Sequence, residues 1–166
     1  MGSSLMTSPS SALEWLRASS SSHEDMLESC VAVCDGEAEV TVIAGAFKGK
    51  AFIPGVYDPK TWSCVIREDN IPEEDFYVLR KDSSLNLTWV SDRDGHAPIG
   101  SLQCGTHFHG EPLYIGRFRC DGRLLSGMVD QQLGGCSIKL LHRQFFSNHY
   151  EVLCLSSVPF GFTYSK

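Results

Sequence analysis

Long apolar runs, clusters of basic residues and catalytic motifs are all missing from this sequence of 166 residues. No window approaches the roughly 18 consecutive apolar residues that a membrane-spanning helix requires, so we expect no transmembrane segment. Lysine and arginine do not cluster along the chain, and the formal net charge is −6. Both features argue against nucleic acid or an anionic membrane as a partner.

Sequence signals of catalysis are equally scarce. There is no Gly-x-Ser-x-Gly elbow, no His-Glu-x-x-His and no phosphate-binding loop. The segment GAFKGK at 45–50 has a faint likeness to a phosphate loop, but it lacks the required spacing and falls in a predicted hairpin. The six histidines lie mostly in turns, where exposure to solvent is the default. We therefore expect a protein that is not an enzyme.

Paired cysteines of the CxxC type are also missing. The seven cysteines are an odd number and are spread along the chain. The first residues show no basic region followed by an apolar core, so we expect no secretory signal. These features together predict reduced, mostly buried thiols in a cytoplasmic protein.

What the sequence does contain is an internal repeat. Four pairs of residues are 72 positions apart: Gly55 and Gly127, Asp58 and Asp130, Cys64 and Cys136, Ile66 and Ile138. Trp15 and Trp89 are 74 positions apart, as are Val78-Leu79 and Val152-Leu153. Around VIAGAF and YIGRF the offset is either 71 or 72. The division that follows is a tail at 1–13, a divergent first repeat at 14–82, a second repeat at 86–157 and a tail at 158–166.

Each repeat has the pattern of β-structure. Runs such as EVTVIAGAF and PLYIGRFR carry β-branched and aromatic residues with partial alternation, and turn signals such as Lys48-Gly49-Lys50 separate such runs. Only SALEWLR at 11–17 and SHEDMLESC at 22–30 have helical character. We predict an all-β fold in which two antiparallel β repeats, related by a pseudo-twofold axis, pack as one sandwich or prism-like domain.

The second repeat resembles the DM-nine repeat family. The resemblance covers roughly Thr88 to Cys154 and is weaker over Glu14 to Arg80. It depends on the matching residues Trp89, Val90, Gly95, Pro98, Gly110, Glu111, Leu113, Tyr114, Gly116, Arg117, Gly127, Tyr150, Glu151, Val152 and Leu153. Similar proteins include mannose-binding lectins of invertebrates and the N-terminal modules of natterin-like toxins, so the resemblance implies sugar pockets between the repeats.

In those lectins an Asp two residues after a Gly, and the Lys of Pro-Gly-Lys, contact the sugar hydroxyls. The Asp position falls on His107 in the second repeat and on Asp35, within one residue, in the first. The Lys position holds Met128 and Val56, and neither side chain can donate a hydrogen bond. Losing a charged hydrogen bond costs about 1.5–3 kcal/mol, which puts inherited mannose binding in question.

The densest group of soft ligands is Cys104, His107 and His109. In an extended segment the two histidines would point to one face, as two ligands of a zinc ion must. The spacing is not that of a standard zinc motif, and a third ligand would have to come from Glu111, Cys104 or Cys120. We therefore expect no cofactor, and the preferred role of these residues is to form the polar rim of a pocket. A zinc site is the weaker alternative.

Arginine and tryptophan are the remaining candidates. We expect Arg117 to pair with a carboxylate such as Glu111 or Glu151. The alternative is that Arg117 contacts a ligand. We expect Trp15 and Trp89 to anchor a core between the two repeats. Cys64 and Cys136 are expected to be buried packing residues. Trp62 has Gly134 as its counterpart in the second repeat. Because this tryptophan is not repeated, Trp62 is a better candidate for a special role than Trp15 or Trp89.

We therefore expect a non-catalytic carbohydrate-binding module of the mannose type, with pockets at the repeat interface and a role in innate recognition. Its candidate ligand contacts are Asp35, Val56, His107, His109, Glu111, Arg117 and Met128. The alternative is a structural or protein-interaction protein of the same fold that has lost sugar binding. The partner is then a glycan or a protein, with a homodimer as one form of the latter.

Overall fold

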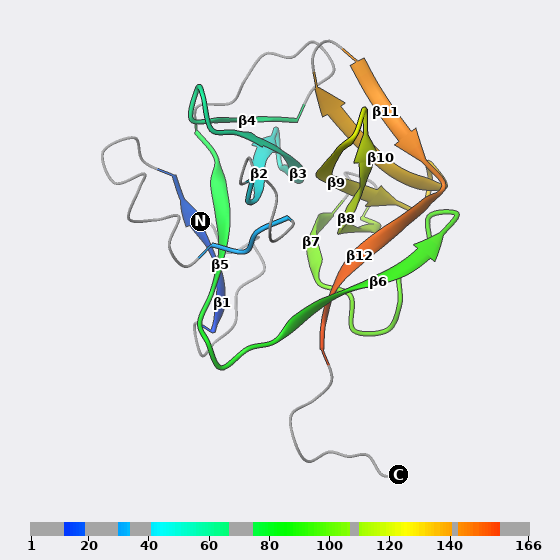
Figure 1. Ribbon diagram of the computed structural model, residues 1–166, viewed down its shortest axis with the longest axis horizontal. Helices are drawn as coiled ribbons and strands as arrows, with labels where there is room; N and C mark the ends of the chain where they lie inside the picture. Colours follow the sequence, from blue (N-terminus) through cyan, green and yellow to red (C-terminus); the bar gives the residue numbers. More distant parts are fainter. Residues whose placement is uncertain are drawn as a thin grey trace.

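The computed structural model describes residues 12–18, 30–33, 41–66, 75–106, 110–140 and 143–156. Within these ranges there are twelve strands and no helix (Figure 1). All pairings between named strands are antiparallel, and they form two sheets. The predicted all-β class is confirmed.

The first half of the chain forms a five-stranded sheet. Its strands are β1 (Leu13–Arg17), β2 (Ile43–Lys48), β3 (Ala51–Asp58), β4 (Ser63–Val65) and β5 (Tyr77–Lys81). They lie in the order β1-β5-β2-β3-β4. The β2–β3 hairpin turns at Gly49 and Lys50, as the sequence predicted.

The second half forms a seven-stranded sheet. Its strands are β6 (Leu87–Arg93), β7 (Gln103–Thr106), β8 (Pro112–Cys120), β9 (Arg123–Asp130), β10 (Gly135–Leu140), β11 (Arg143–Ser147) and β12 (His149–Leu155). Six of them lie in the order β11-β10-β9-β8-β12-β6, and β7 pairs with β8. Figure 1 shows this sheet on the right and the five-stranded sheet on the left.

Strand register shows that the two halves are copies of one arrangement. Gly55 of β3 stands opposite Ala44 of β2, and Gly127 of β9 stands opposite Gly116 of β8. The offset between the two hairpins is therefore 72 throughout, which settles the ambiguity left by the sequence.

The tryptophans obey the same relation. Trp15 of β1 stands opposite Leu79 of β5, and Trp89 of β6 stands opposite Leu153 of β12. Because the two residues occupy the same place in related strand pairs, the pseudo-twofold relation extends from the hairpins to the edges of the sheets.

One helix prediction is wrong. Leu13–Arg17, within the segment SALEWLR, is strand β1, in which Leu13 and Trp15 are buried and Glu14 and Arg17 are less so. This alternation is the period of a strand, and the open edge of β5 supplies the hydrogen-bonding partner that a short helix would lack. Most of the other helical segment, 22–30, lies outside the described residues; its last residue, Cys30, forms an isolated bridge with Arg80.

A shared core joins the halves. One cluster of buried side chains contains Trp15, Ile43 and Leu79 from the first half with Leu102, Ile115 and Leu153 from the second, and Trp89 packs against it. Both tryptophans therefore anchor the inter-repeat core, as predicted. Cys64 and Cys136 are fully buried packing residues, also as predicted.

The halves approach most closely where β7 meets β3. Gly105 of β7 has a φ of +135°, and a Cβ there would lie 2.4 Å from the carbonyl oxygen of Phe52. A side chain at this position would push the two sheets apart, so both the conformation and the contact require glycine.

A candidate ligand site between the two halves

A cavity in the described part of the chain lies where the two halves meet. It has a volume of about 600 Å³, and we call it the seam pocket. From the first half it is lined by the β2–β3 turn and nearby residues: Lys48, Lys50, Ala51, Ile53 and Ile66. From the second half it is lined chiefly by the end of β9, the turn that follows it and β10: Met128, Asp130, Gln132, Leu133 and Lys139.

A smaller pocket of about 210 Å³ is related to the seam pocket by the pseudo-twofold axis. Here the end of β3 contributes Val56 and Asp58, and the β8–β9 hairpin contributes Arg123. Val56 pairs with Val65 as Met128 pairs with Ser137, so the two residues hold equivalent positions. Each pocket thus joins the hairpin turn of one half to a strand end of the other.

Equivalent turns shape one side of each pocket. Asp130 Oδ1 accepts a hydrogen bond of 2.9 Å from the backbone N–H of Gln132, and Asp58 Oδ1 accepts one of the same length from Lys60. A carboxylate bonded to the backbone two residues later is a typical turn device. The buried Asp130 therefore holds Gln132 and Leu133 in place at the seam pocket.

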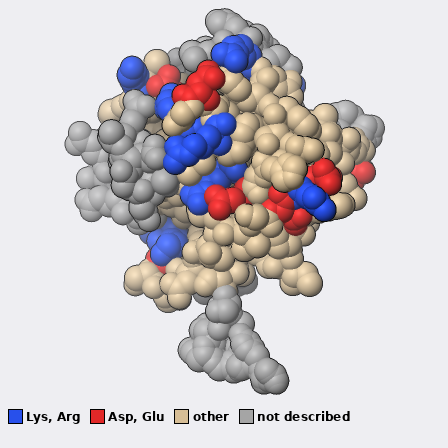
Figure 2. Space-filling view, turned by 45° about the vertical axis from the view of Figure 1, so that its right-hand side comes forward, with Lys and Arg blue, Asp and Glu red and all other residues tan. Residues whose placement is uncertain are grey.

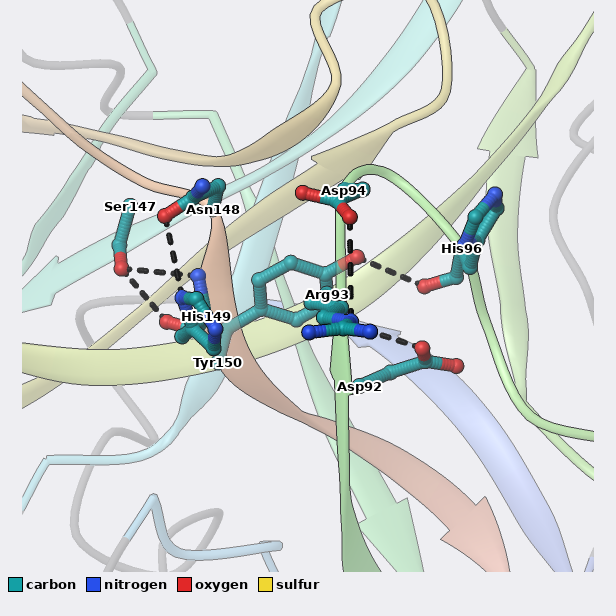
Figure 3. A network of polar contacts seen from close by, with 8 residues as sticks. All are labelled: Asp92, Arg93, Asp94, His96, Ser147, Asn148, His149 and Tyr150. Carbon is teal, nitrogen blue, oxygen red and sulfur yellow. Dashed lines mark hydrogen bonds and ion pairs between the residues drawn. The ribbon is translucent and has the colours of Figure 1, made fainter.

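A polar network at one end of β6 and β12 supports this turn from behind (Figure 3). The hydroxyl of Tyr150 donates to the carbonyl oxygen of His96 at 2.8 Å, and Asp94 and Gly95 form a tight turn with positive φ. A Cβ on Gly95 would lie 3.0 Å from the Cα atoms of Gln131 and Gly134. The network therefore fixes a surface against which the pocket turn packs.

The predicted ligand residues lie in different places. Met128 lines the seam pocket and Val56 the smaller one. Glu111 lies at the edge of the seam pocket, where its Oε1 accepts a hydrogen bond of 2.6 Å from the side-chain amide of Gln132. The candidates Asp35, His107 and His109 lie outside the described residues.

Arg117 lies away from both pockets. Its Nε donates to Glu151 at 2.8 Å, and another of its nitrogens donates to the carbonyl oxygen of Val33 in the first half. The guanidinium also stacks on the ring of Trp89. These contacts agree with the carboxylate-pairing role that the sequence favoured for Arg117 over contact with a ligand.

Cys104, the thiol of the suggested metal cluster, is a core residue. It is only 1% exposed, and burial raises its pKa well above the ordinary value. Because thiolate is the form that binds metals, this cysteine is poorly suited to be a ligand. Among the described residues, no group of three His, Cys, Asp or Glu side chains could hold a metal ion.

Sequence reasoning missed the charged residues of the seam pocket. Lys48 ends β2, Lys50 lies in the hairpin turn, Lys139 lies on β10, and Asp130 is the last residue of β9. The signal available was the segment GAFKGK, which lacks the spacing of a phosphate loop but does carry two of these lysines. Their meeting with Lys139 crosses from one half to the other, so the linear sequence does not record it.

Positive and negative side chains lie side by side on one face of the molecule (Figure 2). Figure 2 shows a face on which Lys and Arg side chains lie beside Asp and Glu side chains, with broad uncharged areas between the groups. Exposed ion pairs such as Arg143 with Asp121, at 3.4 Å, are of this kind. This mixture leaves that face without an extended field of one sign.

Comparison with known protein families shows to which family the chain belongs. The sequence model of the DM9 repeat matches residues 35–146, which is more than half of the chain. The chain belongs to the DM9 repeat family. None of the curated proteins matches its sequence. The matched interval of the DM9 repeat contains both hairpins and every strand that lines a pocket.

DM9 membership supports a lectin-like, carbohydrate-binding class of domain. Within the described ranges of this DM9 protein, no helix has the length and apolar character needed to cross a bilayer. Its seam pocket combines charged donors, a carboxylate and apolar side chains.

Proposed function

We propose that this DM9 protein is a non-catalytic carbohydrate-binding module whose ligand occupies the seam pocket. The observation that carries the proposal is the composition of that pocket, which both halves build. Lys48, Lys50 and Gln132 offer hydrogen-bond donors to hydroxyl groups, while Met128 and Leu133 offer apolar contact to the C–H face of a sugar ring. A volume of about 600 Å³ has room for one or two sugar rings.

Mannose is the first ligand to test, because the chain belongs to a family that resembles mannose-binding lectins. The lysine position of those lectins holds Met128 here, but Lys48, Lys50 and Lys139 line the same pocket. Lys48 and Lys50 can replace the lost donor from the opposite side of the cavity, and Lys139 can do so from the strand beside Met128. A charge-assisted bond from lysine to a hydroxyl is stronger than a neutral one, so one replacement is sufficient to restore useful affinity.

The smaller pocket favours a second candidate function. With Val56 at the lysine position and a volume of about 210 Å³, this site has too little space for a sugar ring with its surrounding contacts. A protein that has lost one of its two sugar sites is a candidate for a protein-interaction module. In that case its partner is another protein or a second copy of the chain.

Calorimetric titration of the full chain with mannose and with mannan, in the presence of EDTA and then of zinc, separates the two candidates. Saturable heat with one site per chain in both conditions supports the carbohydrate-binding function at the seam pocket. Heat that requires zinc would assign a role to His107 and His109 instead. No heat with any sugar would remove the lectin function, and sedimentation of the same sample would then test for a homodimer.

A further inference from the structure

Positive charge is concentrated in the seam pocket. Lys48, Lys50 and Lys139 line it, whereas Asp130 is the single carboxylate among its described lining residues. The whole chain carries a formal net charge of −6. Three ammonium groups around one cavity are therefore opposite in sign to the protein that holds them.

The carboxylates near the pocket already have partners. Asp130 accepts the backbone N–H of Gln132, and Glu111 accepts the side-chain amide of the same residue. These bonds hold the turn and the edge of the pocket in place. Both carboxylates keep their negative charge, so Lys48, Lys50 and Lys139 outnumber Asp130 and Glu111 by one among the described residues of the pocket and its edge.

The hairpin turn brings two of the lysines together. Gly49 has a φ of +64° and forms the two-residue turn together with Lys50, while Lys48 is the last residue of β2 before it. Both side chains are exposed, so their charge remains available to an incoming group. Ammonium groups that line one cavity repel one another, and a bound anion relieves that repulsion.

We propose that the seam pocket binds a sugar that carries a negatively charged substituent, either a carboxylate or a phosphate. This inference rests on the proposed carbohydrate-binding function and names the class of sugar. The lysines donate charge-assisted hydrogen bonds to the anionic group. Met128, Ile53 and Leu133 provide the apolar surface against which the sugar ring packs.

The test compares matched ligands by calorimetry on the full chain at low salt. The pairs are mannose with mannose 6-phosphate, and glucose with glucuronate; inorganic phosphate shows whether an anion suffices without a sugar. We expect each acidic sugar to bind at least about tenfold more tightly than its neutral partner and more tightly than inorganic phosphate, with a preference that falls as salt rises.

The double variant Lys48→Gln, Lys50→Gln assigns the effect to the seam pocket. Both residues are exposed at a turn, so we expect an unchanged melting temperature and a loss of the acidic preference. Lys60→Gln, which changes a lysine of the smaller pocket, is the matched control and should preserve the preference.

Four outcomes would overturn the inference. Equal affinity for acidic and neutral sugars contradicts it while leaving the proposed function intact. Equal affinity for mannose 6-phosphate and inorganic phosphate reduces the site to one for a simple anion. An acidic preference that survives in the double variant places the binding elsewhere. Failure of every sugar to bind would remove the proposed function as well.

Discussion

The guanidinium carbon of Arg117 lies 4.3 Å from the centre of the Trp89 ring. The register of β2 and β8 makes Gly45 the counterpart of Arg117 in the first half. There the ring of Phe52 fills the space above the glycine and packs on Trp15, with 4.8 Å between the ring centres. The same tryptophan position is thus covered by a cation in one half and by a phenyl ring in the other.

We expect Arg117→Ala to lower the free energy of unfolding by about 2 kcal/mol, because it removes the stacking on Trp89 and leaves the Val33 carbonyl without its donor. Urea unfolding at neutral pH measures this change. Arg17→Ala is the control, since Arg17 forms an exposed ion pair with Asp75 and should change stability by less than about 0.5 kcal/mol. Equal effects of the two variants would show that the contacts of Arg117 add nothing to stability.

Trp62 and Gly134 occupy equivalent positions in the two pocket turns. Both have positive φ, 54° for Trp62 and 78° for Gly134, and each donates its N–H to the carbonyl of the equivalent aspartate. A bulky residue in this region is strained by about 1–2 kcal/mol. Trp62 is 37% exposed, so the larger part of its side chain is covered by neighbouring residues.

We therefore expect Trp62→Gly to lower the free energy of unfolding, because the packing lost with the indole exceeds the strain that glycine relieves. The reverse change, Gly134→Ala, meets open space and should lower it by about 1 kcal/mol through backbone strain alone. Thermal and urea unfolding of both variants test the pair. A stabilised Trp62→Gly would mean instead that the backbone strain outweighs the contacts of the indole.

Thiol ionisation makes stability depend on pH. Burial, followed by the nearby Asp121, raises the pKa of Cys120 from 9.0 to about 11. The folded protein therefore keeps this proton at pH values where the unfolded chain releases it. The resulting contribution to stability is complete below pH 9 and is lost as the pH rises to about 11.

Urea midpoints measured across this range should fall with rising pH, and the fall should be shallower in Cys120→Ala than in the unchanged protein. The comparison of slopes isolates the thiol from lysine and tyrosine groups that titrate in the same range. Identical slopes would place the raised pKa of Cys120 in doubt.

Local sequence signals were sufficient for much of the fold. The glycine and aspartate pairs 72 positions apart identified the two hairpins because each position carries a geometric requirement: a Cβ at Gly127 would lie 2.2 Å from the Ser137 carbonyl oxygen, and one at Gly55 would lie 2.4 Å from that of Val65. Strand β1 was mistaken for a helix because its pattern is short and its β character depends on pairing with β5.

The seam pocket could not be predicted in the same way. Met128 was identified through the resemblance, and Glu111 through its place in the matching motif. The lysines that face them come partly from the other half of the chain, and the packing of β3 against β7, β9 and β10 brings the two sets together. A contact that crosses between repeats leaves no periodicity in either one.

Met128 offers the most direct test of what this chain has lost. It is a buried residue that lines the seam pocket at the position where the mannose-binding relatives carry lysine. We expect Met128→Lys to tighten mannose binding by about tenfold or more, because a charged hydrogen bond contributes about 1.5–3 kcal/mol. Calorimetric titration with mannose measures the gain.

Met128→Leu preserves the apolar surface without adding a donor, so it should leave the affinity within about a factor of three. Val56→Lys, at the equivalent position of the smaller pocket, should give no comparable gain because that cavity holds only about 210 Å³. If Met128→Lys folds normally, as judged by its melting curve, and still binds mannose no better than Met128→Leu does, then the donor missing at this position is not what limits sugar binding.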